Sequence, residues 1–143
     1  MNIRKAKLDD YKDLAKLNID LGYDYPVEKV KKNLKNILDK NIDLLYVAVN
    51  ENDRAIGFIH FGSYDLIYLD NFIDIIGLVV SNDHRKKGIG KELLDVAENY
   101  GKINGYAGVR LVSGEDRIEA HRFYEKCGYH NRKNQKNFIK MFN

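Results

Sequence analysis

Residues 78–91 read Leu-Val-Val-Ser-Asn-Asp-His-Arg-Lys-Lys-Gly-Ile-Gly-Lys, and this stretch decides how the rest of the chain is interpreted. It joins the end of an apolar run to a basic loop with two glycines, and then to the start of a helix. Glycines let the backbone come close to a ligand, and the free N–H groups that begin a helix attract anions. The stretch therefore predicts a loop that binds phosphate groups. The alternative is a solvated basic turn that only starts a helix.

Two familiar phosphate-binding loops do not match these letters. A Walker A loop requires Gly-x-x-x-x-Gly-Lys-Ser/Thr, but Lys91 is followed by Glu92 and no glycine stands five residues before Gly90. A dinucleotide-binding loop requires a third glycine where this chain has Leu93. Nucleotide hydrolysis and nicotinamide chemistry are therefore both disfavoured.

The apolar pattern on either side of the loop predicts a mixed α/β chain with elements in the order β-α-α-β-β-β-α-β-α-β. The strand at 72–80 is apolar on both faces except for Asp74, as expected for a strand buried in the middle of a sheet. The expected strands cover residues 2–6, 44–49, 55–61, 72–80, 109–112 and 138–142, and the expected helices cover 8–21, 26–38, 89–101 and 117–126.

Length and composition favour one soluble domain over residues 1–143. Hydrophobic residues make up 44% and charged residues 31% of the chain, which is typical of a folded protein outside the membrane. The net charge of +3 is a small difference between 24 basic and 21 acidic residues, too weak to indicate nucleic-acid binding. No apolar run approaches the roughly 20 residues that cross a bilayer, and the start lacks the apolar stretch of a secretory signal.

Cysteine and histidine usage argues against disulfides and structural metals. Cys127 is the only cysteine, which agrees with a reducing compartment, so we expect the protein in the cytoplasm. The histidines at 60, 84, 121 and 130 are scattered without the spacing of a zinc site, and we expect no metal.

Two motifs in this order resemble those of the GNAT acetyltransferases. The pyrophosphate loop of that family is written Gln/Arg-x-x-Gly-x-Gly/Ala, and Arg85-x-x-Gly88-x-Gly90 fits it without a gap. The run 78–80 is similar to the end of the family's fourth strand, and residues 120–129 resemble its later Ala-x-x-Phe-Tyr-x-x-x-Gly-Phe/Tyr motif. The resemblance implies a single mixed, mostly antiparallel sheet flanked by helices, with acetyl-CoA as cosubstrate.

The resemblance also implies which residues hold the cosubstrate. The backbone N–H of Leu78 would polarise the thioester carbonyl, Val80 would contact pantetheine, and Tyr124 would be the general acid for the leaving thiolate. A tyrosine is protonated at neutral pH and can donate to a thiolate. The cofactor-binding residues expected are Leu78, Val79, Val80, Arg85, Lys86, Lys87, Gly88, Ile89, Gly90, Lys91, Arg117 and His121.

Two of the cofactor-binding assignments have open alternatives. Many family members carry Asn at the place of Arg117, so this arginine contacts a phosphate or forms a surface ion pair with Glu115 or Asp116. His121 shares a helix face with Arg117 and Tyr124, and is either a helper near the cofactor or a plain surface residue. Cys127 is most simply a small buried apolar residue.

Asp74 is the predicted general base for the acceptor amine, the weakest of the assignments. Strict strand alternation would put it on the same face as Ile76 and Leu78, aimed at the acceptor. His60 and Tyr64 are further candidates, and a satisfied buried carboxylate is the structural alternative for Asp74.

The leading function is N-acetylation of a small-molecule or peptide amine by acetyl-CoA. A non-catalytic acyl-CoA sensor of the same fold is the alternative, and Tyr124 is the residue that discriminates between the two. A nucleic-acid-binding domain is a third and weaker reading, because the basic loop stands without a recognition motif. The sequence excludes neither a monomer nor a homodimer.

Overall fold

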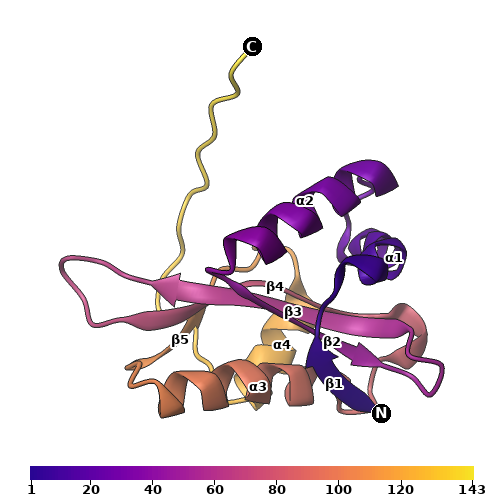
Figure 1. Cartoon of the computed structure of the whole chain (residues 1–143). Helices are drawn as coiled ribbons and strands as arrows, with labels where there is room; N and C mark the ends of the chain where they lie inside the picture. Colours follow the sequence, from indigo (N-terminus) through magenta and orange to yellow (C-terminus); the bar gives the residue numbers. More distant parts are fainter. The chain divides into compact units, whose positions relative to one another are not determined.

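The computed structural model describes all 143 residues, which divide into two units, Met1–Val112 and Ser113–Asn143. The first unit contains a five-stranded sheet in the order β1-β2-β3-β4-β5 (Figure 1). Its strands are β1 (Asn2–Lys5), β2 (Leu44–Val49), β3 (Ala55–Tyr64), β4 (Phe72–Val80) and β5 (Gly108–Leu111). Five of the six predicted strands thus form one sheet within this unit.

The pairing confirms the expected mixed, mostly antiparallel sheet. β1, β2, β3 and β4 pair antiparallel in sequence order, and β5 pairs parallel to β4. The parallel ladder joins Phe72–Ile75 to Gly108–Leu111 and ends there. The remaining part of β4 is therefore paired on one side only, by β3.

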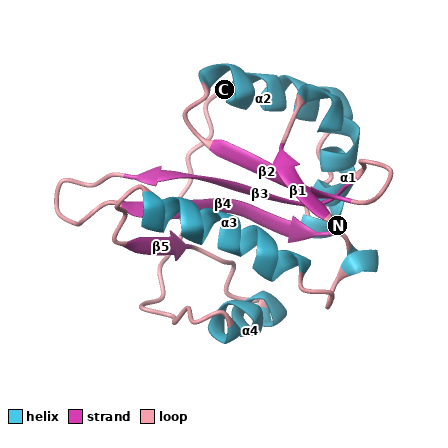
Figure 2. Ribbon diagram, turned by 60° about the horizontal axis from the view of Figure 1, so that its bottom comes forward, coloured by secondary structure: helices cyan, strands magenta, loops and turns pink.

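Helices cover both faces of the sheet (Figure 2). α1 (Tyr11–Leu21) and α2 (Val27–Lys40) pack on one face, and α3 (Ile89–Ile103) packs on the other. Short 3₁₀ turns, η1 (Leu8–Asp10) and η2 (Asn82–His84), lie before α1 and after β4. The predicted helices are present, because each has an apolar stripe at helical spacing to bury.

The two faces of the sheet have separate cores. On the first face, buried residues of α1 and α2 such as Leu14 and Leu34 pack with Val47 and Phe58 of the sheet. On the other face, a side chain at Gly57 would lie 3.2 Å from Leu93 of α3. The sheet therefore holds its position through apolar contacts on both sides.

The second unit contains one helix, α4 (Ile118–Lys126), within the range predicted from the sequence. The strand predicted at residues 138–142 is wrong, because this segment forms no helix or strand and pairs with none of the five strands. Phe138 and Phe142 are 88% and 89% exposed. An apolar, β-prone composition does not make a strand by itself, since the backbone also needs a neighbouring strand for its hydrogen bonds.

Candidate functional site

A β-bulge interrupts β4 in its middle. His60 of β3 pairs with Gly77 and the next residue, Phe61, pairs with Ile75, so Ile76 has no partner on β3. Its side chain is 52% exposed, which differs from the fully buried strand expected from the apolar sequence. Bulges bend a strand and change the direction in which its side chains point.

The bulge changes the face on which Asp74 lies. Leu78 pairs with Ile59 and Asp74 pairs with Gly62, and these two β3 partners are three residues apart, so they face opposite sides. The prediction that Asp74 shares a face with Leu78 is therefore wrong, since it assumed unbroken alternation. Asp74 lies on the face of His60, the face that α1 and α2 cover.

Beyond the bulge, Gly77–Val80 has no ladder partner on the β5 side. Leu78 and Val80 are half-buried, whereas the Val79 side chain is buried in the core with Phe58. Strand backbone that lacks a ladder partner leaves N–H and C=O groups available to a ligand. The predicted pantetheine-contacting stretch thus coincides with the part of β4 that is paired on one side.

The glycine loop ends at an uncapped helix. Gly88 is the N-cap of α3 with a left-handed backbone (φ 83°), and no side chain caps the first turn. Arg85, Lys86 and Lys87 are exposed and form no ion pair, and Lys86 also has a positive φ of 65°. A lysine adopts that conformation rarely, because its Cβ is crowded there, so the loop holds Lys86 in a strained backbone conformation.

Ile89 and Lys91, two further residues predicted to bind the cofactor, also make contacts within the protein. The Ile89 side chain is 5% exposed and belongs to the core, so only its backbone is available to a ligand. Lys91 pairs with Asp95 one helical turn later, at 3.0 Å between Nζ and Oδ1. Gly90 is the second residue of α3.

In the second unit, Tyr124 lies among aromatic rings. Its ring centroid is 5.3 Å from that of Phe123 and 5.9 Å from that of Tyr129. Burial raises the pKa of the Tyr124 hydroxyl above its usual value, and the charge of Arg117 opposes this only in part. The hydroxyl is therefore protonated at neutral pH and can act as a donor.

The two other predicted residues of this unit occupy the start of α4. Arg117 is the N-cap residue. His121 Nε2 lies 2.9 Å from the Gly114 carbonyl oxygen, so this imidazole holds the loop before the helix. Cys127 is half-buried.

A cluster of charged residues lies on the α1 and α2 face of the sheet. His60 Nε2 is 3.0 Å from Asp43 Oδ2, and Arg110 Nη1 donates to Asp74 Oδ1 at 2.7 Å. The Arg110 guanidinium also lies 4.1 Å from the centroid of the Tyr64 ring. Asp43 and Arg110 carry no signal in the sequence, because Asp43 meets His60, and Arg110 meets Asp74, only once the strands are paired.

Competing effects act on the Asp74 carboxyl. Burial is the largest and raises its pKa, the charge and hydrogen bond of Arg110 lower it, and the nearby Asp43 charge raises it again, with a net upward shift. The Asp74 carboxyl is thus a weaker acid than that of an exposed aspartate, although the Arg110 guanidinium donates a hydrogen bond to it.

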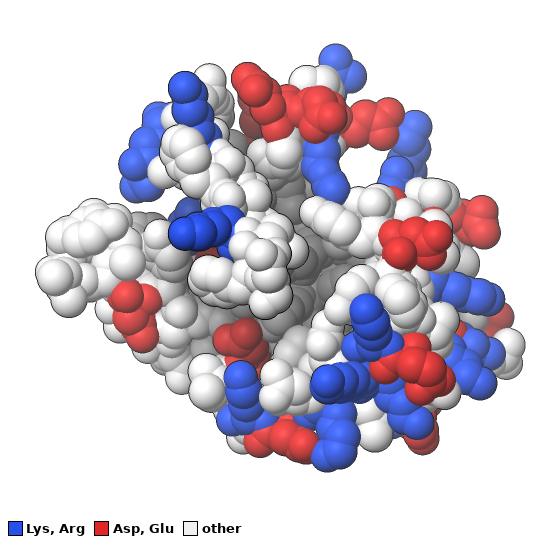
Figure 3. Space-filling model, turned by 90° about the horizontal axis from the view of Figure 1, so that it is seen from above, with Lys and Arg blue, Asp and Glu red and all other residues white.

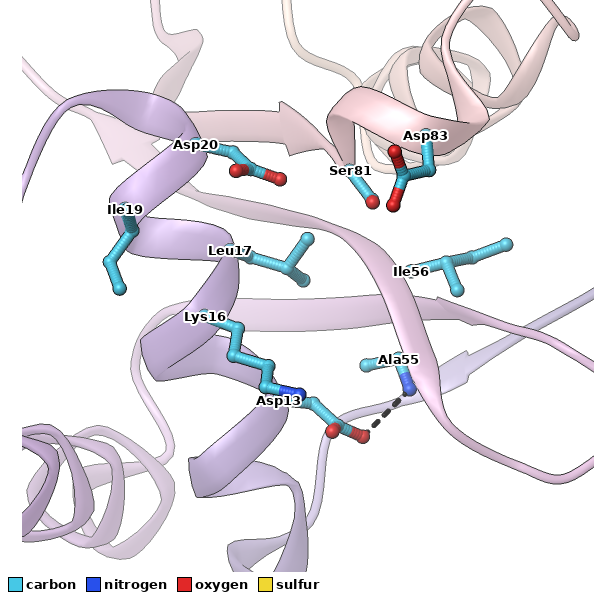
Figure 4. A pocket seen from close by; sticks show the side chains of 9 residues that line it. All are labelled: Asp13, Lys16, Leu17, Ile19, Asp20, Ala55, Ile56, Ser81 and Asp83. Atoms are coloured by element: carbon cyan, nitrogen blue, oxygen red, sulfur yellow. Dashed lines mark hydrogen bonds between the residues drawn. The ribbon is translucent and has the colours of Figure 1, made fainter.

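Two cavities border the face covered by α1 and α2. The smaller, about 150 Å³, lies between α1, α2 and β3, and its lining includes Phe58 and His60 together with Asn18, Tyr25 and Asn33. The larger, about 330 Å³, lies between α1, the start of β3 and η2 (Figure 4). Its lining residues are Asp13, Lys16, Leu17, Ile19, Asp20, Ala55, Ile56, Ser81 and Asp83.

Hydrogen bonds within the protein occupy most of the carboxylates around the larger cavity. Asp13 accepts the backbone N–H of Ala55 and the guanidinium of Arg54, and Asp20 accepts the backbone N–H of Asn82. These bonds tie α1 to the sheet and to the turn after β4. Acidic surroundings also disfavour a phosphate ligand, so we do not place the anion site in this larger cavity.

Comparison with known proteins identifies the family. Residues 11–129 match the model of the Acetyltransferase (GNAT) family. The chain belongs to the GNAT acetyltransferases. Its curated relatives include the uncharacterized N-acetyltransferase MJ1207 of Methanocaldococcus jannaschii. The two sequences are 27% identical over an alignment of 149 residues, gaps included, which covers 98% of this chain. The chain spans 64% of that relative's length.

Solved structures of similar fold include two acetyltransferases with named acceptors. An aminoglycoside antibiotic 6'-N-acetyltransferase from Acinetobacter haemolyticus superposes on this GNAT chain with a TM-score of 0.84 at 18% identity, covering 100% of both chains. A glucosamine-6-phosphate N-acetyltransferase from Arabidopsis thaliana gives a TM-score of 0.80 at 21% identity, covering 96% of this chain and 97% of that one. At these identities the likeness establishes the shared fold.

Three further observations on the GNAT chain concern membrane-spanning helices, metal ligands and surface charge. No helix has the length and apolar character needed to cross a bilayer, and no group of three or more metal-ligating side chains gathers in the structure. Acidic and basic side chains are interspersed on the face seen in Figure 3.

Proposed function

We propose that this GNAT protein transfers the acetyl group of acetyl-CoA to a primary amine of a small molecule or peptide. The observation that carries the proposal is the uncapped start of α3, next to three cations that form no ion pair. Like charges beside the positive end of a helix dipole are unfavourable unless an anion neutralises them. A pyrophosphate is such an anion, and it accepts backbone N–H groups at a helix start.

In this proposal the loop holds the phosphates of the cosubstrate. Arg85, Lys86, Lys87 and Lys91 supply positive charge, and the backbone from Gly88 to Gly90 supplies N–H donors. Pantetheine lies against the part of β4 that β5 leaves uncovered, at Leu78, Val79 and Val80. Acetyl-CoA supplies an activated thioester carbonyl, and the Leu78 N–H polarises it.

Tyr124 acts as the general acid in this proposal. Its hydroxyl delivers a proton to the departing sulfur, and the upward shift of its pKa keeps that proton in place at neutral pH. Arg117 contacts a phosphate, and His121 supports it by ordering the loop before α4 through the Gly114 carbonyl. The two units work as one acetyltransferase domain, since the family match spans both.

The acceptor side of this proposal uses the charged cluster on the α1 and α2 face. An alkylammonium has a pKa of about 10.4 and must lose a proton before its nitrogen can attack a carbonyl. Asp74 and His60 both lie on this face and are candidates to accept that proton. The named acceptors of the structural relatives, an aminoglycoside and an amino sugar phosphate, fit the expectation of an amine.

A binding experiment followed by an acceptor screen tests the proposal. Calorimetry should show that CoA and acetyl-CoA bind far more tightly than ATP or NAD, with affinity that falls as salt screens the phosphates. A panel of amines incubated with acetyl-CoA should then release free thiol with at least one acceptor. Absence of CoA binding would exclude the GNAT reaction, and tight binding without turnover on any amine would favour the sensor alternative.

A further inference from the structure

A glycine on the α1 and α2 face makes room for the charged cluster. A side chain at Gly62 would overlap the Asp43 carboxylate, so the absence of a Cβ there lets this carboxylate lie against the sheet. From that position Asp43 reaches His60. Gly77 is the direct partner of His60 on β4, and the Phe58 ring packs against it on this face, 3.4 Å from where a Cβ would be.

The imidazole of His60 has one nitrogen engaged and one without a partner. Nε2 is bonded to Asp43, and an ionised carboxylate accepts a hydrogen bond, so Nε2 carries the hydrogen. Nδ1 makes no hydrogen bond and is left with a lone pair. An aspartate that orients a histidine in this way is the usual arrangement for a general base.

His60 also lines the cavity of about 150 Å³ under α1 and α2. A cavity of this volume accommodates a single aromatic ring. Its lining is largely apolar, with Leu14, Val30 and Phe58 among its walls, and polar groups from Asn18, Asn33 and Tyr25 are added. This combination suits a ligand with a compact apolar body and one polar end.

His60 and the open part of β4 meet at one point of the sheet. Gly77, the cross-strand partner of His60, is the residue before Leu78, whose N–H is proposed to polarise the thioester. Directly paired residues have their Cβ positions about 4.5–5.5 Å apart. An amine at His60 would therefore lie one residue along the sheet from Leu78, next to the Phe58 ring that both lines the cavity and packs on Gly77.

The geometry points to His60 as the general base and to this cavity as the acceptor site for a primary amine with a compact apolar body. The inference rests on the proposed acetyl transfer. Nδ1 accepts one proton from the acceptor ammonium, which leaves a neutral amine and an imidazolium that Asp43 stabilises. As the amide forms, the nitrogen loses its second proton, which ends on the departing sulfur through Tyr124, and the imidazolium returns its proton to solvent.

Asp74 is the less suitable base because Arg110 already holds its carboxylate. Asp43, from the segment before β2, contacts His60, and Tyr25, from the segment before α2, lines the same cavity. Asp74 of β4, Arg110 of β5 and Tyr64 of β3 are the other charged and titratable groups on this face. Asp43 is thus a positioning residue, and Asp74 with Arg110 forms a separate pair on the same face.

The acceptor site is tested with phenethylamine as the compact probe and spermidine as an extended polycation. Phenethylamine should perturb the NMR signals of Phe58 and His60 without acetyl-CoA present, and its kcat/KM should exceed that of spermidine at least tenfold. Asn33→Phe fills the cavity from the exposed side of α2 and should lower kcat/KM for phenethylamine tenfold or more. Asn36→Phe, exposed on the same helix but outside the cavity, is the matched control and should have no effect. Signal changes elsewhere, or a preference for spermidine, would overturn the site.

The base is tested by pH profiles of His60→Gln, which keeps a polar side chain of similar size. The wild-type kcat/KM should be flat from about neutral pH up to the pKa of the amine, because imidazole takes the proton from the ammonium form. In His60→Gln it should rise tenfold per pH unit over the same range, following the neutral amine, with a loss of about 10²-fold at pH 7. Asp43→Asn should give a smaller loss in the same direction.

The outcomes separate the inference from the proposed function. CoA affinity and the circular dichroism spectrum should be unchanged in His60→Gln, which shows that the variant is folded. If His60→Gln keeps the wild-type profile while Asp74→Asn loses it, the base is Asp74 and the inference fails, although acetyl transfer stands. If the wild-type protein binds no CoA, the proposed function itself fails.

Discussion

The two halves of β4 have similar apolar sequences and different neighbours. Phe72–Ile75 pairs with both β3 and β5, and Ile73 within it is fully buried. Gly77–Val80 pairs with β3 alone, and its Leu78 is half-buried. The bulge at Ile76 separates the two halves.

Under the proposed function, one strand serves both stability and ligand binding. A half enclosed on both edges uses all its backbone groups in the sheet, so its side chains contribute mainly to the core. A half with one open edge gives up part of that stability and leaves backbone groups for a cosubstrate. We therefore expect substitutions before the bulge to affect folding, and those after it to affect binding and turnover.

The largest effect should come from Tyr124, which lies outside β4. Because Tyr124 is proposed to act in the chemical step, its substitution should affect neither the stability nor the cosubstrate binding attributed to the two halves of β4. Tyr124→Phe removes only the hydroxyl, so we expect kcat to fall by about 10² to 10⁴ while CoA affinity changes little. Tyr129→Phe, which removes a neighbouring hydroxyl, serves as the control. A Tyr124→Phe enzyme with wild-type kcat on an established acceptor would indicate that the ring serves packing alone.

Ile73→Ala should be the most destabilising change within β4. Ile73 has no exposed surface, and its Cγ1 lies 3.0 Å from where a Cβ of Gly101 would be, so α3 packs directly on it. Deleting a buried isoleucine to alanine costs about 2–5 kcal/mol, measurable by urea unfolding. Leu78→Ala, in the half-open part, should cost less than half as much and should weaken CoA binding. Equal stability losses in the two variants would contradict the comparison.

Gly88→Val should weaken CoA binding at least 100-fold and leave the protein folded. Gly88 has a φ of 83°, and a Cβ there would meet no atom within 4 Å, so the side chain disturbs the loop conformation and the ligand space but not the core. Gly90→Val should also block binding, because it places a β-branched side chain in the first turn of α3, where the phosphates are proposed to approach the backbone. Gly105→Val is the matched control, with a φ of 77° and equally open surroundings after α3. Similar losses of CoA affinity in Gly88→Val and Gly105→Val would show that backbone strain alone is responsible.

The smallest effect should come from Asp13, which links α1 to the start of β3. The start of β3 pairs with the half of β4 that follows the bulge. The hydrogen bond from Arg54 is the largest influence on the pKa of Asp13 and lowers it, and the hydrogen bond from the Ala55 N–H lowers it further. This carboxylate therefore stabilises the fold only when it is ionised. Because the folded pKa lies below the unfolded value of about 3.9, the stabilisation is present above that pH and is lost as the pH falls through the folded pKa.

Asp13→Asn should therefore reduce the free energy of unfolding by about 1 kcal/mol at pH 7, and by progressively less below pH 4. Asp39→Asn, which breaks an exposed pair with Lys35, should leave stability within error. A stability difference between wild type and Asp13→Asn that stays constant down to pH 2 would contradict this account.

The sequence by itself determined the order of helices and strands up to residue 126 and the place of the glycine loop. These features depend on interactions close in the chain, namely apolar periodicity, helix-starting residues and glycines at turns. The bounds of β2 and β4 agree with the predicted ranges 44–49 and 72–80 for this reason. The family motifs around Gly88 and Tyr124 were readable for the same reason, since each is a short run of consecutive residues.

Only the tertiary structure decided which side chains meet. The bulge that turns Asp74 away from Leu78 arises from the pairing of β3 with β4, and single-strand periodicity carries no information about a partner's register. Asp43 and His60 are 17 residues apart in sequence, and Asp74 and Arg110 are 36 apart. The absent strand at 138–142 has the same cause, because a strand exists only where a second strand supplies its hydrogen bonds.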